Sequence, residues 1–192
     1  MPGLPHRREQ PAQEREQLIH ATGVALSRPC TLRERLAEVI RLARAAGICT
    51  AGAFHLPSLD ECFLYVHDGL SRLPIEDGAE ASLSEELNDA FAALLAGAKP
   101  PPSVAATESG SWCFDIPPQP TDGALSHWRR RFGPLLLVPL RAGEETNGLL
   151  LVAARRDSHF GSEAVACLGT IAAMSALAVA AELAQTRLVA AQ

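Results

Sequence analysis

Aromatic residues are scarce in this sequence, and their scarcity limits how a core can be built. The 192 residues include six Phe, two Trp and one Tyr, whereas hydrophobic residues of all kinds make up 47%. A core of ordinary size must therefore consist mostly of Leu, Ala, Val and Ile. The length suits one domain, or one domain with helical arms.

Signals for targeting, membrane insertion and nucleic-acid binding are also weak. Residues 1–17 are charged and lack the apolar core of a signal peptide. The apolar run Ile171–Ala181 is rich in Ala and interrupted by Ser175, so we expect it to be too short and too weakly apolar for a membrane span. The net charge of −5 gives no general attraction to nucleic acid or anionic lipid. These observations predict a cytoplasmic protein that binds neither nucleic acid nor membrane.

The cysteines do not form a recognisable metal or redox motif. Their number is odd, no C-x-x-C is present, and no pair has the spacing of zinc ligands. In a cytoplasmic protein we expect reduced thiols, several of them buried as small hydrophobic groups. The five residues are Cys30, Cys49, Cys62, Cys113 and Cys167.

Local patterns predict the elements of the fold. Residues 1–13 are rich in Pro and polar groups, which favours a disordered tail before a single domain over 14–192. Helical spacing is found over 14–26, again from Leu32 to a stop at Gly47, and over 82–95. The second helix has the clearest start, because Thr31 and Glu34 have the spacing of a capping box. A final helix follows Ser162 as N-cap and runs nearly to residue 192.

The predicted strands fall into hairpins. Extended runs at 48–56 and 62–67 are joined by a short turn, and runs at 135–140 and 149–153 flank a polar turn over 141–148. A short strand is expected within 111–116. Because strands group into hairpins rather than alternating singly with helices, the pattern predicts an α+β domain with an antiparallel sheet and helices packed on one face.

Two segments resemble the GAF domain family. The first is LRERLAEVIRLARAAGICTAGAFHL, continuing to FLYVHDGL, and the second is GPLLLVPLRAGEETNGLLLVAARRDSHFGSEAVACLGTIAAMSALAVAAEL. In the second segment the matching positions are Pro139, Leu140, Gly148, Leu149 and Phe160. The resemblance implies a GAF/PAS-like central antiparallel sheet of five or six strands. The N- and C-terminal helices would pack on one face, and a loop and helix lid would cover a ligand pocket on the other.

The resemblance also implies a function. GAF domains typically bind a small molecule, or only dimerise, and pass a signal to an attached effector domain. We therefore expect a sensory domain in signal transduction, a homodimer through its terminal helices, with a C-terminal helix that leads to an effector. The identity of the ligand or cofactor stays unknown, because the fold does not determine it.

The predicted lid covers residues 70–133, and it directs attention to aromatic and basic side chains on that side of the sheet. Aromatic walls with a few polar groups are typical of small-molecule sites. An alternative is that these aromatic residues only cover an otherwise exposed sheet face. The candidate ligand-binding residues are Tyr65, His67, Trp112, Phe114, His127, Trp128 and Arg131.

Charged and histidine residues allow further interpretations. The triplet Arg129–Arg131 could bind a phosphate, carboxylate or nitrate, or form a solvated helix face. His55, His67, His127 and His159 have no recognisable ligand spacing, so no metal site is predicted. No Cys is followed by His, which disfavours the covalent bilin attachment of some GAF relatives.

Catalysis is not expected, since the sequence contains no recognisable Ser/His/Asp set, phosphate loop or carboxylate pair. One enzyme, free methionine-(R)-sulfoxide reductase, shares the fold. It would need a reactive and a resolving Cys, and only Cys113 lies in the predicted lid. The favoured hypothesis is a ligand-binding sensor, the alternative is a ligand-free dimerisation or relay module, and the reductase is the third.

Overall fold

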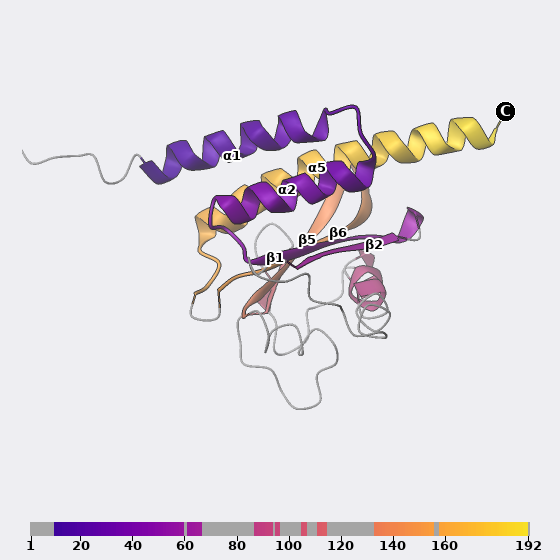
Figure 1. Ribbon diagram of the computed structural model, residues 1–192. Coiled ribbons are helices and arrows are strands. Elements are labelled where there is room, and N and C mark those ends of the chain that lie inside the picture. Colours follow the sequence, from indigo (N-terminus) through magenta and orange to yellow (C-terminus); the bar gives the residue numbers. More distant parts are fainter. Residues whose placement is uncertain are drawn as a thin grey trace, which may run out of the picture.

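The computed structural model of the protein describes residues 10–59, 61–66, 87–93, 95–96, 105–106, 111–114, 133–155 and 158–191. For 10–11, 61–66, 105–106 and 112–114 it describes the backbone alone. Within these residues three long helices lie on one side of an antiparallel sheet (Figure 1). The predicted α+β class, with its antiparallel sheet and with the terminal helices on one face, is therefore confirmed.

The sheet has its longest strands at its centre. The described strands follow the order β2-β1-β6-β5-β4-β3, and every neighbouring pair is antiparallel. A single 3-10 turn, η1 (Pro57–Leu59), joins β1 to β2. The strands are β1 (Ala51–Leu56), β2 (Glu61–Val66), β3 (Ala105–Ala106), β4 (Trp112–Phe114), β5 (Leu135–Ala142) and β6 (Glu145–Ala153).

Three helices cover what we call the helix face of the sheet. They are α1 (Gln10–Leu26), α2 (Leu32–Ala45) and α5 (Ser162–Ala190). Phe54, Leu136, Val138, Leu150 and Val152 of the central strands pack against them in one cluster of buried residues. Since strand side chains alternate, the intervening residues lie on the opposite side, the distal face. There Ala53, Leu137, Leu151 and their neighbours pack with Leu87 and Ala90 of the helical segment 87–93.

The start and end of α2 follow from its sequence. The Thr31 hydroxyl accepts a hydrogen bond from the backbone N–H of Glu34 at 3.2 Å, and the Glu34 carboxylate accepts one from the backbone N–H of Thr31 at 2.9 Å. At the other end Gly47 has a φ of 72°, and the N–H of Ile48 donates to the carbonyl of Ala43. This arrangement satisfies the last carbonyls of the helix. The predicted capping box and the predicted stop at Gly47 are both confirmed.

Three predicted boundaries are wrong. The expected eight-residue turn over 141–148 is a two-residue turn at Gly143 and Glu144, because both strands continue through their polar ends. The helix α1 begins at Gln10, inside the expected tail, while residues 1–9 lie outside the described chain. The N-cap of α5 is Gly161 rather than Ser162, and no side chain caps it. Polar composition alone does not reveal how far strand pairing or helix packing extends the elements.

The sequence argument against a membrane span also needs correction. By length and composition α5 could cross a membrane, although 39% of the apolar window is already buried inside the protein. Leu168, Ile171, Ala172 and Val179 of this helix are at most 1% exposed, and they belong to the core on the helix face. Part of the apolar surface of α5 thus packs against this domain itself.

Candidate functional site

A buried histidine lies on the distal face of the sheet. His55 is the fifth residue of β1, where it shares the distal face with Ala51 and Ala53 by alternation. Only 3% of His55 is exposed. Its Nε2 lies 3.0 Å from Oδ1 of Asn88, in the helical segment that packs on this face.

The hydrogen bond to Asn88 defines the chemistry of the imidazole. The amide oxygen of Asn88 can only accept, so Nε2 of His55 carries the proton and donates. Burial lowers the pKa of His55 below its ordinary value, and the bond to Asn88 only partly opposes this effect. The ring is therefore neutral, and Nδ1 presents a lone pair. Within the described residues this buried Nδ1 has no hydrogen-bond partner, although buried polar atoms are nearly always paired.

Among the described residues, those that surround His55 on the distal face are mostly apolar. Its partner across β6 is Leu149, and the next rows pair Ala53 with Leu151 and Ala51 with Ala153. On the other side of His55, Gly148 of β6 approaches so closely that an added Cβ would lie 2.3 Å from the His55 carbonyl oxygen. Asn147, which precedes this glycine, is also buried and its Nδ2 has no partner in the described chain. Polar groups here are few and incompletely paired.

From the sequence, His55 is a histidine without ligand spacing, and the expectation there is a surface or partly buried side chain without a metal. Within the described residues no group of three or more His, Cys, Asp or Glu side chains could hold a metal ion. The sequence signal that could have singled out His55 is the alternation of side chains along β1. Phe54 and Leu56 lie on one face of the strand, and His55 is the polar residue among the apolar positions of the other face.

Three of the predicted site residues lie on described strands. Trp112 pairs with Leu137 and Phe114 with Leu135, and both partners are buried on the distal face. Directly paired residues occupy the same face of a sheet, so these are distal-face positions. Tyr65 pairs instead with Gly52, where an added Cβ would lie 2.6 Å from Ile40 of α2. That register position belongs to the helix face.

The other predicted site residues lie outside the described chain: His67, His127, Trp128 and Arg131. Among the described cysteines, Cys49 and Cys167 are buried and Cys30 is exposed. Burial raises the pKa of Cys49 to about 12 and also raises that of Cys167. Neither buried thiol has the depressed pKa of a reactive cysteine.

Comparison with known proteins identifies the fold. No family model matches the sequence, and no curated protein matches it. Fourteen chains of known structure do match. One is the GAF domain of a protein assigned as a sensor histidine kinase from Pseudomonas syringae pv. tomato, with a TM-score of 0.60 and 16% identity. The match covers 98% of this chain and 100% of that one. The fold is that of a GAF domain.

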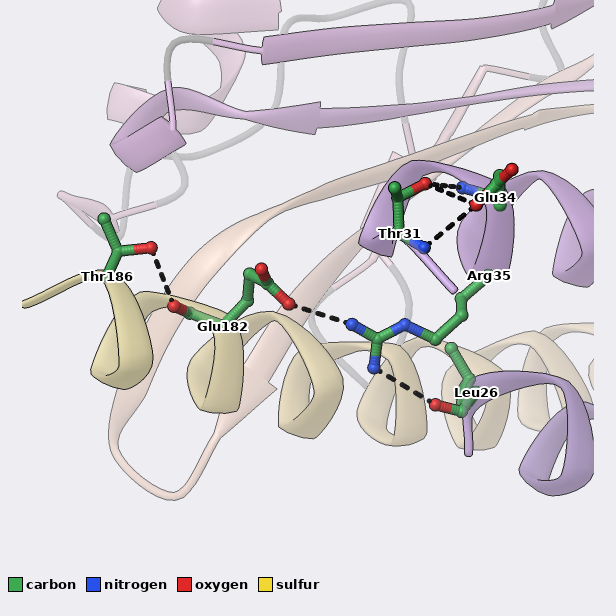
Figure 2. A network of polar contacts seen from close by, with 6 residues as sticks. All are labelled: Leu26, Thr31, Glu34, Arg35, Glu182 and Thr186. Atoms are coloured by element: carbon green, nitrogen blue, oxygen red, sulfur yellow. Dashed lines mark hydrogen bonds and ion pairs between the residues drawn. The ribbon is translucent and has the colours of Figure 1, made fainter. Parts of the chain in front are cut away.

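A polar junction links the three helices of this GAF fold (Figure 2). The Arg35 guanidinium of α2 donates to the Leu26 carbonyl at the end of α1 at 3.3 Å, and to the Glu182 carboxylate of α5 at 2.9 Å. Leu183 is the last buried residue of α5, and 184–191 are all exposed. The junction therefore lies where α5 leaves the body of the domain, as its yellow end shows in Figure 1.

A surface hollow lies at the opposite end of the three helices from the Arg35 junction. Its volume is about 470 Å³, and it lies between the start of α1, the end of α2 and the start of α5. Arg15 and Glu163 line it and form an ion pair. None of the residues around His55 lines this hollow, so it does not belong to the distal face.

Proposed function

We propose that this chain is a cytoplasmic sensory or regulatory domain that binds a small molecule on the distal face and relays the event through α5 to an effector. The observation that carries the proposal is His55, a buried and neutral histidine whose Nδ1 lacks a partner in the described chain. A ligand that bonded to this atom would remove the cost of leaving it unpaired.

The proposed wall of the ligand site extends from His55 across the distal face. Trp112 and Phe114 hold distal-face positions by register, which supports their assignment as aromatic contacts. His67, His127, Trp128 and Arg131 stay candidates from the sequence. We leave Tyr65 out of the wall, because its register position belongs to the helix face.

The proposed relay passes through Arg35. This side chain bonds to α1 and α5 at the same time, so a shift of either helix must change its contacts. Beyond Leu183 the exposed end of α5 would carry the change onward. The Arg35→Met variant should increase hydrogen exchange over 184–190, whereas the control Arg41→Met removes an exposed pair with Glu38 inside α2 and should not. Equal exchange in the two variants would remove Arg35 from the relay.

A second candidate function is a dimerisation or relay module without a ligand. It is favoured by apolar side chains that the helices leave exposed: Val24 of α1 at 50%, and Leu177, Leu188 and Val189 of α5 at 63%, 68% and 68%. Exposed apolar groups along a long helix suit a second copy of the chain. A regulatory role without catalysis fits both candidates.

Native mass spectrometry of the protein purified from cells separates the two functions. A dimer with added mass on each chain supports the ligand-binding sensor. A dimer without added mass, whose melting temperature no small molecule raises, supports the ligand-free module, because a ligand that binds only the folded state must stabilise it. A monomer at high concentration would contradict the assembly through terminal helices in both cases.

A further inference from the structure

We propose that the ligand of the distal face is an uncharged, largely apolar molecule that donates one hydrogen bond, from an N–H or O–H group, to Nδ1 of His55. The inference rests on the proposed function and adds the chemical class of the ligand. It follows from the hydrogen-bonding state of His55 and from the residues that surround it.

The first step concerns direction. Oδ1 of Asn88 accepts a hydrogen bond from Nε2–H of His55, with 3.0 Å between the nitrogen and the oxygen, so the other ring nitrogen carries a lone pair. A lone pair accepts a hydrogen bond and repels carbonyl or carboxylate oxygens. The group that meets Nδ1 must therefore be a donor. An ionised carboxylate or nitrate has no hydrogen to donate, so the described site disfavours these anions.

The second step concerns charge. The described apolar neighbours of His55 on this face are Ala51, Ala53, Leu149, Leu151 and Leu87, and the buried polar side chain beside Gly148, Asn147, is uncharged. A cation placed among them would lose its hydration without gaining an opposite charge. A neutral donor loses little, because its one polar hydrogen meets Nδ1 and the rest of its surface meets aliphatic side chains.

The third step concerns shape. The β1 side of the face carries Ala51 and Ala53, and Ala153 lies directly across from Ala51, whereas β5 presents Leu135 and Leu137. The alanine side chains on the strand of His55 occupy less volume than the leucine side chains farther along the sheet. Ala51 and Ala53 are at most 1% exposed, so a flat ring that directs an N–H or O–H toward the imidazole must displace the protein groups that cover them.

Two isosteric probes test the donor requirement. Indole carries one N–H, and benzofuran has the same shape with an oxygen in its place. We would titrate each into protein labelled with ¹⁵N at histidine and at the backbone. We expect indole to bind about tenfold more tightly than benzofuran, since only indole pairs the buried acceptor. Indole should also shift the Nδ1 resonance of His55, whereas benzofuran should leave it nearly unchanged.

Two variants and one control keep the test valid even if one substitution disturbs folding. His55→Leu removes the acceptor, so the preference for indole should disappear. Asn88→Ala alters an exposed residue and leaves His55 in place, but it frees the imidazole to move its proton to Nδ1, so the preference should fall. Asp89→Ala changes the exposed neighbour on the same helical segment and should keep the wild-type preference.

The outcomes distinguish the inference from the function it rests on. Equal binding of both probes, with shifts at the amides of Ala53 and Leu151 but none at Nδ1, overturns the donor class and leaves the ligand face standing. No amide shift on the distal face with either probe overturns the ligand face itself. Indole preference that Asn88→Ala weakens and Asp89→Ala preserves supports the inference.

Discussion

Replacing Gly148 by alanine tests the packing that positions His55. Gly148 lies in β6, directly beside β1. A Cβ at this position would lie 2.3 Å from the carbonyl oxygen of His55 and 2.9 Å from Cδ2 of Leu56. The oxygen belongs to backbone that is paired with β2 on one side and β6 on the other, so it has little freedom to move.

The expected cost can be worked out from two opposing effects. Overpacking a well-filled interior destabilises by about 1–3 kcal/mol. Losing the flexibility of glycine in the unfolded chain stabilises by about 0.4–1 kcal/mol. Because the obstacle is fixed backbone, we expect the upper end of the first range and a net loss of about 2 kcal/mol. For a chain of this length that corresponds to a melting temperature about 4–8 °C lower.

The Gly169→Ala variant is the matched control. Gly169 lies within α5, and a Cβ there would meet nothing within 4 Å. Alanine in a helix is favoured over glycine, so this variant should be stabilised by about 0.5–1 kcal/mol. Urea unfolding followed by circular dichroism measures both changes. If Gly148→Ala were as stable as the wild type, β1 and β6 could not approach as described, and the placement of His55 would be refuted.

Three further predictions follow from single groups. The folded-state pKa of His55 is lowered, so stability should be highest above about pH 6.5 and fall as the pH drops toward 5, because the unfolded chain binds the proton more readily. An equally steep fall in His55→Leu would contradict this origin. Iodoacetamide at pH 8 should modify exposed Cys30 and spare Cys49, whose pKa is raised to about 12, as peptide mass spectrometry would show; rapid labelling of native Cys49 would count against its burial. Thr31→Ala should lower stability by about 1 kcal/mol in thermal unfolding, through loss of the cap on α2, and an unchanged melting temperature would show that the cap contributes nothing.

Features that depend on neighbouring residues in the sequence were predicted well. The capping box at Thr31 and Glu34 and the glycine stop at Gly47 are short-range devices, and both are present. The two hairpins were also found, since apolar runs joined by short links have few other solutions. From these local features the antiparallel α+β arrangement followed.

Features that depend on distant contacts were missed. The polar ends of β5 and β6 have the sequence pattern of a turn, because residues 141–147 are mostly polar whereas the rest of both strands is apolar. His55 looked ordinary, because Asn88 lies 33 residues away and no spacing rule connects the two. Arg35 and Glu182 are separated by 147 residues, so their junction was equally invisible to local reasoning.

The central claim is that a small molecule occupies the distal face beside His55. A high-resolution crystal structure of the protein as purified from cells, or soaked with indole, tests it most directly. The account predicts non-protein density with a donor group within hydrogen-bond distance of Nδ1 of His55. A side chain of the protein itself bonded to Nδ1, with the face closed around it, would contradict the claim.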